Sequence, residues 1–212
     1  MKVGAAEMAR EVRVVIDENR MSDSLLPEED IDTLSLEEII LSKLTDGVRI
    51  VEMEAPLELL ESGHSLGSEV YIDKETGKGY MILPRDFLRL RVFRMSDWSR
   101  PIFEAISERD AQYSLQCSKW KGIYGSPEKP VVAIVGRNEG RVLEFYSCES
   151  DEATVVQGSY IPEPRIDDNG LIDLSEACYR AAVYRTAGLV LASLGDQLSG
   201  TMVEISRSFL QV

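Results

Sequence analysis

Histidine is almost absent from this sequence, because His64 is the single one among its 212 residues. A metal site built from several histidines is therefore excluded, and a serine–histidine–acid triad would have to use His64. Cysteine is scarce as well: Cys117, Cys148 and Cys178 stand far apart, and no C-x-x-C pair occurs. This pattern argues against a zinc ribbon or a disulfide framework, and it predicts free, buried thiols in a reducing compartment.

Basic residues are outnumbered, with 23 Lys and Arg against 37 Asp and Glu, for a net charge of −14. Such a surface repels nucleic-acid backbones and anionic membranes on average, so general DNA or RNA binding is disfavoured. The chain also lacks an apolar run long enough for a signal peptide or a membrane span. We therefore expect a soluble protein that is made in a cytosol and has no membrane partner.

Motifs of known chemistry are scarce. The G-x-x-x-x-G-K-[S/T] of a P-loop does not occur. Gly63-His64-Ser65-Leu66-Gly67 has the spacing G-x-S-x-G, but a nucleophile elbow needs a strand before its serine and a helix after it, and strands are predicted after this segment. His64 falls in a segment that its composition predicts to be a loop, where Ser62 or Ser65 could pair with it as nucleophile and base. Serine beside histidine in a glycine-containing loop is common, so we expect no enzyme. A small acidic hydrolase that uses His64 or carboxylates is the alternative.

Carboxylates gather in two places without a metal-binding pattern. Asp167 and Asp168 precede Asn169 and Gly170, and this order is typical of a polar turn. The acidic run at 28–32 lacks the regular alternation of an EF-hand loop, and we interpret it as a solvated connector. We therefore expect no metal ion and no cofactor.

Apolar residues recur at helical spacing near the start of the chain. The spacing predicts a helix from about residue 4 to residue 20. After an acidic connector, Ser35 and Glu38 form a capping box that begins a second helix, which Pro56 bounds. Gly47 should weaken the middle of this second helix by roughly 1 kcal/mol relative to alanine.

A further helix is predicted near the end of the chain. Asp173 can cap it, and it should run from about residue 174 to residue 194 with a face of small residues that lets another helix approach closely. Gly195 and Asp196 should break or kink it. An apolar stripe then continues to the C-terminus.

From about residue 67 to residue 160 the apolar period changes to two, which indicates β-strands. Turn sequences at 74–77 and 136–140 predict two hairpins, and 111–120 is also predicted to be a strand. Several short strands at turn-punctuated intervals favour an antiparallel sheet or a small sandwich.

The predicted fold class is therefore α+β, with two parts. The N-terminal helices and the long C-terminal helix form a helical core from residues 1–64 and 165–212, and residues 65–164 form an antiparallel β insert. The terminal helices must pack together, because a single amphipathic helix is not stable alone. Residues 1–64 hold sixteen acids and six bases, so most of the negative charge belongs to the helical core.

An arginine-rich strand is the clearest local feature. The segment 87–95 alternates, which places Leu88, Leu90 and Val92 on one expected face and arginines on the other. The five arginines of this region are Arg85, Arg89, Arg91, Arg94 and Arg100. They form either a solvated face paired with its own acids, which stabilises little, or a contact surface for an acidic neighbour such as the helical core of another copy. If the basic patch of one copy contacts the acidic patch of the next copy, the copies associate head-to-tail. They form a ring if the rotation from each copy to the next returns to the first copy after a whole number of copies.

The C-terminal stretch at 199–212 is apolar on one face. One interpretation is that it is the last helix of the core. The other is that it docks on a partner subunit. The sequence leaves both open.

The order of these elements resembles the head–tail adaptor proteins, also called connector or ring proteins, of short-tailed bacteriophages. A first helix and an acidic connector lead to a second helix that ends near Ala55-Pro56. A β insert follows with the strand ILPRDFLRL at 82–90, and a proline-containing exit at 160–164 leads into the Ala-rich closing helix that begins near AAVY at 181–184. The chain is also similar, more weakly, to ring proteins of crAss-like phages.

The resemblance implies a structural role in the virion neck. Such adaptors form rings of about twelve copies beneath the portal protein, contact other neck or tail proteins, and let DNA pass without sequence-specific binding. It implies that the arginine strand contacts neighbouring subunits and that the C-terminal segment docks on the portal through Ile205, Phe209, Leu210 and Val212. Assembly would take place in the host cytoplasm. A cellular protein–protein adaptor unrelated to phages is a further alternative.

Overall fold

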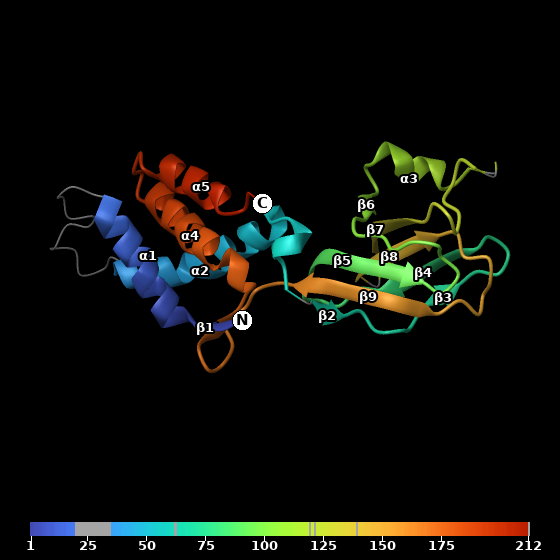
Figure 1. The fold of residues 1–212 in the computed structure, drawn as a ribbon, viewed down its shortest axis with the longest axis horizontal. Coiled ribbons are helices and arrows are strands. Elements are labelled where there is room, and N and C mark those ends of the chain that lie inside the picture. Colours follow the sequence, from blue (N-terminus) through green and yellow to red (C-terminus); the bar gives the residue numbers. More distant parts are fainter. Residues whose placement is uncertain (20–34, 62, 119, 121, 139, 212) are drawn as a thin grey trace. The chain divides into compact units, whose positions relative to one another are not determined.

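The computed structural model describes residues 1–19, 35–61, 63–118, 120, 122–138 and 140–211 (Figure 1). Its fold class is α+β, as the sequence predicts. The chain forms two compact units: Met1–Glu61 with Glu163–Val212, called the helical unit below, and Ser62–Pro162, called the β unit. The boundaries expected from the sequence, 64/65 and 164/165, lie a few residues further along the chain.

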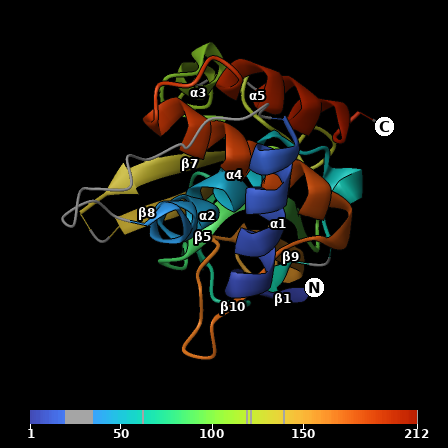
Figure 2. The same ribbon diagram turned by 90° about the vertical axis from the view of Figure 1, so that its left-hand side faces the viewer.

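The helical unit draws its elements from both ends of the chain. They are β1 (Lys2–Gly4), α1 (Ala5–Asn19), α2 (Leu36–Glu54), β10 (Leu171–Asp173), α4 (Tyr179–Ser193) and α5 (Ser199–Ser208), with short 3₁₀ turns at Leu57–Leu59 and Glu176–Cys178. Helix α4 contacts α1, α2 and α5 (Figure 2). It is therefore buried on most of its circumference, as a helix with few charged residues requires.

The first two predicted helices are confirmed. Helix α1 buries Met8, Val12 and Ile16, the residues at helical spacing. At the start of α2, the Glu38 amide donates to Ser35 Oγ at 3.3 Å and the Ser35 amide donates to Glu38 Oε2 at 2.8 Å. These two bonds make the predicted capping box.

The predicted start of the C-terminal helix is wrong. Asp173 does not cap a helix, because it belongs to strand β10 and pairs with Lys2 in an antiparallel ladder. The chain then makes a 3₁₀ turn, and α4 begins at Tyr179. Ladder pairing with the first residues of the chain holds this stretch extended, and local periodicity contains no sign of that distant partner. The predicted break at Gly195, whose φ is 73°, is confirmed.

Gly47 has a role in packing that helix propensity does not include. A Cβ atom at this position would lie 2.1 Å from Thr186 Oγ1 and 3.1 Å from Thr186 Cα. Gly188 acts similarly towards α5, where a Cβ would lie 3.1 Å from Val203 Cγ2. The two glycines therefore let α2 and α5 approach α4 closely.

The β unit consists of two sheets. Its strands are β2 (His64–Ser65), β3 (Tyr71–Ile72), β4 (Lys78–Ile82), β5 (Phe87–Met95), β6 (Ile106–Ser107), β7 (Val131–Arg137), β8 (Gly140–Tyr146) and β9 (Val155–Pro162). One sheet has the order β2-β9-β5 and the other β3-β4-β8-β7-β6, and all neighbours are antiparallel except β6 and β7. Both predicted hairpins, β3–β4 and β7–β8, are confirmed. Residues of both sheets, such as Phe93, Met81 and Phe145, meet in one apolar core.

The simple alternation predicted for the arginine strand is wrong. The buried residues of β5 are Phe87, Leu90, Phe93 and Met95, whereas Leu88 and Val92 are half-buried. The pairing of β5 with β9 shifts register at three places along the strand. Each bulge adds a residue to one strand and turns the following side chains, so the strict period of two is lost.

The predicted strand at 111–120 is also wrong. Residues Ala111–Leu115 form the short helix α3, and Asp110 Oδ1 accepts a hydrogen bond from the Gln112 amide at 2.9 Å. This N-cap favours a helical turn over an extended strand.

Candidate functional site

The five arginines predicted as a subunit interface do not share one environment. Arg85 and Arg100 are exposed on the segments that flank β5. Arg89, Arg91 and Arg94 are half-buried on β5 itself. Arg94 Nε donates to the Trp98 carbonyl oxygen at 3.3 Å. The cluster thus has two exposed members and three that pack partly against their own unit.

The two acids near these arginines hold parts of the β unit together. Asp86 Oδ1 accepts a hydrogen bond from the Tyr160 hydroxyl at 3.0 Å. Asp97 Oδ2 accepts one from the Glu149 amide at 2.7 Å. Each acid therefore joins two segments that are distant in sequence.

The C-terminal residues predicted to dock on a portal also differ in exposure. Leu210 is buried and Ile205 is half-buried, while the Phe209 side chain is 39% exposed. The Phe209 ring centroid lies 5.5 Å from that of Tyr184. Val212 lies outside the described residues. Among the three described residues of this set, Phe209 therefore offers the largest accessible apolar surface.

His64 lies on strand β2 and is exposed, so its prediction as a loop residue is wrong. Its ring is edge-on to Tyr160, with centroids 5.9 Å apart. Ser65 Oγ accepts a hydrogen bond from the Gly67 amide at 3.1 Å. Successive strand residues point to opposite faces, so His64 and Ser65 do not form the considered pair. Ser62 lies outside the described residues.

The predicted polar turn at Asp167 is confirmed. Asp167 Oδ1 accepts hydrogen bonds from the Asn169 and Leu171 amides, both at 2.9 Å. The acidic run at 28–32 lies outside the described residues. Within the described part of the chain, no group of three or more His, Cys, Asp or Glu side chains is placed to hold a metal ion.

All three cysteines are free, but only two are buried. Burial raises the pKa of the Cys148 thiol to about 12 and that of Cys178 to about 11. Cys117 is exposed, against the prediction, because it follows the surface helix α3 and does not lie on a strand. Its Sγ lies 3.9 Å from Lys78 Nζ.

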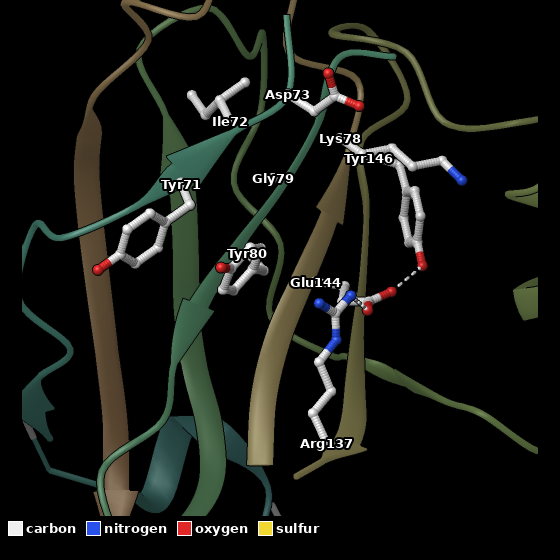
Figure 3. Close-up of a pocket in the computed structure, with 9 residues that line it drawn as sticks. All are labelled: Tyr71, Ile72, Asp73, Lys78, Gly79, Tyr80, Arg137, Glu144 and Tyr146. Carbon is white, nitrogen blue, oxygen red and sulfur yellow. Dashed lines mark hydrogen bonds and ion pairs between the residues drawn. The ribbon is translucent and has the colours of Figure 1, made fainter. Parts of the chain in front are cut away.

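A polar and aromatic cluster covers the outer side of strands β3, β4 and β8 and the end of β7 (Figure 3). Its members, called the tyrosine face below, are Tyr71, Lys78, Tyr80, Arg137, Glu144 and Tyr146. Strand register explains why they share a face: Tyr71 is opposite Tyr80, Tyr80 is opposite Glu144, and Lys78 is opposite Tyr146. Cross-strand partners project to the same side of a sheet.

Glu144 organises the centre of the tyrosine face. Its carboxylate accepts hydrogen bonds from the Tyr146 hydroxyl at 2.7 Å and the Tyr113 hydroxyl at 3.3 Å, and it forms an ion pair with Arg137. Burial raises the pKa of Glu144, but the bonds from Tyr146 and Arg137 outweigh it and hold that pKa below its ordinary value. Glu144 is therefore ionised at neutral pH.

Aromatic rings and cations flank this centre. The Tyr71 and Tyr80 rings are stacked, with centroids 5.1 Å apart and planes 19° apart. The Arg137 guanidinium lies 5.0 Å from the Tyr80 centroid, and Lys78 Nζ lies 5.4 Å from that of Tyr146. These contacts are typical cation–π distances and fix the rings in place.

The tyrosine face was not among the sites predicted from the sequence. A local signal exists, because Glu144 and Tyr146 are separated by one residue on a predicted strand, and Lys78, directly before another predicted strand, is separated by one residue from Tyr80 on it. Such spacing places each pair on one side of its strand. What brings the two pairs together is the pairing of β4 with β8, which joins segments more than fifty residues apart and has no local signal.

In comparisons with known proteins, no family model and no curated protein matches this chain. No helix in the described part of the structure is long and apolar enough to cross a lipid bilayer.

Proposed function

We propose that this protein is a structural head–tail adaptor of a short-tailed bacteriophage that forms a ring of about twelve copies beneath the portal and extends the DNA channel. The unequal charge of the two units carries the proposal. The helical unit holds 23 acids and 10 bases, whereas the β unit holds 14 acids and 13 bases. An acidic helical wall would repel the DNA backbone, so DNA could slide along it without sticking.

The order of the elements supports the same proposal. Helices from both ends of the chain form one unit, and the β unit is inserted between them, which is the arrangement that the adaptor resemblance implies. The exposed Arg85 and Arg100 would contact the acidic helical unit of a neighbouring copy in a head-to-tail ring. Phe209 and the half-buried Ile205 would contact the portal, and other neck proteins would follow below the ring.

The mass of the isolated protein, with and without a purified portal ring, tests this function. We expect a closed ring of defined copy number in native mass spectrometry and electron microscopy, either alone or on the portal. Because exposed charges are screened by salt, ring formation should weaken as ionic strength rises. A monomer that binds no portal ring under any of these conditions would contradict the proposal.

A charge-reversal pair tests the interface. The variant Arg85→Glu with Arg100→Glu changes two exposed residues, so the fold should survive while ring assembly is lost. Arg109→Glu with Lys129→Glu is the matched control, because these residues are exposed in the same unit, outside the arginine cluster, and the change in charge is identical. Equal assembly of the two variants would rule out the arginine interface.

A further inference from the structure

The tyrosine face borders a hollow that the adaptor function does not use. The hollow has a volume of about 380 Å³, which is within the range of small-molecule sites. Tyr71 also lines a second hollow of about 380 Å³, together with Leu66, Ser68 and Ile82. Tyr71 is therefore common to two adjacent depressions on the β unit.

Tyr71 provides an accessible aromatic platform. Its side chain is 54% exposed although one side of the ring stacks on Tyr80. Tyr80 is in turn held by the Arg137 guanidinium. A ring that is supported from one side and open on the other can receive a flat, weakly polar molecule with little loss of side-chain freedom.

Hydrogen-bonding groups surround this platform. Arg137 donates to Glu144, and a guanidinium has five N–H donors in all. The Tyr71 and Tyr80 hydroxyls make no hydrogen bond within the described part of the chain. Donors and acceptors are thus available beside an apolar ring face.

The charges that line the hollow balance. Lys78 and Arg137 are offset by Asp73 and Glu144. Glu144 is held ionised by its hydrogen bonds, and bonds from Thr76 and the Glu75 amide likewise lower the pKa of Asp73. A polyanion such as a nucleic acid would meet two carboxylates and no excess of positive charge, so its binding is disfavoured.

We propose that the tyrosine face is a binding site for neutral carbohydrate, with one sugar ring stacked on Tyr71. The C–H face of a pyranose is apolar and fits an aromatic ring, and its hydroxyl groups both donate and accept hydrogen bonds. Arg137 and the two tyrosine hydroxyls supply the matching groups at its rim. The two hollows that meet at Tyr71 leave room for an oligosaccharide that extends beyond the stacked sugar.

The test is a titration of the full chain with neutral oligosaccharides, followed by amide chemical shifts and calorimetry. The probes are oligomers of glucose in α and β linkage, galactose, mannose and N-acetylglucosamine, and a thymidine oligonucleotide serves as the anionic comparison. We expect at least one sugar to bind and to shift the amides of β3, β4 and β8. If none binds at up to about 10 mM, or if the oligonucleotide binds more tightly than every sugar, the proposal is overturned.

Three variants assign the binding to the platform. Tyr71→Ala should weaken it roughly tenfold or more, whereas Tyr71→Phe, which keeps the ring and loses only one hydroxyl, should weaken it clearly less. Phe103→Ala is the matched control, since Phe103 is an equally exposed aromatic residue of the β unit outside the hollow. Unfolding midpoints verify that each variant is folded. Sugar binding that Tyr71→Ala leaves unchanged would overturn the assignment, and none of these results depends on ring assembly.

Discussion

The helical unit and the β unit achieve their packing with different residues. Twelve of the fifteen aromatic residues lie in the β unit, where rings such as Phe93 and Trp98 fill the space between two sheets. The helical unit uses small residues instead, and Gly47 and Gly188 let helices touch α4 directly. Wide inter-sheet spaces need large side chains, whereas close helix crossings need small ones. The two units should therefore respond differently to the same kind of change.

The largest difference should come from adding one methyl group to a helix. Gly47→Ala places a Cβ 2.1 Å from Thr186 Oγ1, so we expect it to lower the free energy of unfolding of the helical unit by about 3 kcal/mol. Gly200→Ala in α5 is the matched control, because a Cβ there meets no atom within 4 Å. It should stabilise by about 0.5–1 kcal/mol through helix propensity. Urea denaturation followed by circular dichroism measures the change in the free energy of unfolding for both variants. If both changes had the same sign, the close-packing argument would be contradicted.

The stability of the two units should also depend on pH in opposite directions. Burial raises the pKa of Glu52 in α2 to about 7, from an ordinary value of 4.5. The folded helical unit then binds more protons than the unfolded chain between these values, so its stability falls as the pH rises from 4.5 to 7. Glu144 behaves oppositely: its pKa is lowered, so its contribution is present above pH 4.5 and is lost as the pH falls through its folded pKa.

Two amide variants test this contrast. Glu52→Gln should be more stable than the natural chain by about 2 kcal/mol above pH 7 and should differ little near pH 4.5. Glu144→Gln should instead reduce the stability of the β unit at neutral pH. Denaturation curves over the pH range, with hydrogen exchange to distinguish the units, give the result. If Glu52→Gln were more stable than the natural chain by the same amount near pH 4.5 and above pH 7, the raised pKa of Glu52 would be refuted.

The smallest expected effect lies within the tyrosine face. The Tyr146 hydroxyl donates to Glu144 at 2.7 Å, so Tyr146→Phe should cost the β unit about 1–2 kcal/mol. Tyr71→Phe removes a hydroxyl that has no partner in the described residues, and its effect should stay within about 0.5 kcal/mol. Thermal unfolding compares the two variants. A larger loss for Tyr71→Phe would mean that the hydroxyl of Tyr71 stabilises the fold.

Some elements could be predicted because their signals are local. The apolar spacing of α1, the capping box of Ser35 and Glu38, and the turns of the two hairpins each depend on residues within a few positions. Other predictions were wrong because a local pattern was overridden or misinterpreted. Bulges disturbed the alternation of β5, and the N-cap of Asp110 turned a predicted strand into α3.

The sites also divide into features that have a local signal in the sequence and features that depend on tertiary packing. The arginines could be found in the sequence, but their exposure could not, since burial of Arg89, Arg91 and Arg94 depends on how β5 packs. The tyrosine face could not be found as a group, because Tyr80 and Glu144 meet only through pairing of β4 with β8.

The sequence by itself determined the α+β class, the first helix with its periodic apolar face, the start of the second at its cap, and the concentration of acids in the segments of the helical unit. These properties depend on composition and on neighbours along the chain. Tertiary structure alone decided that Lys2 pairs with Asp173, that Gly47 meets Thr186, and that Tyr80 and Tyr113 lie beside Glu144. The physical reason is that such contacts form between segments distant in sequence, where the gain from packing outweighs local preference.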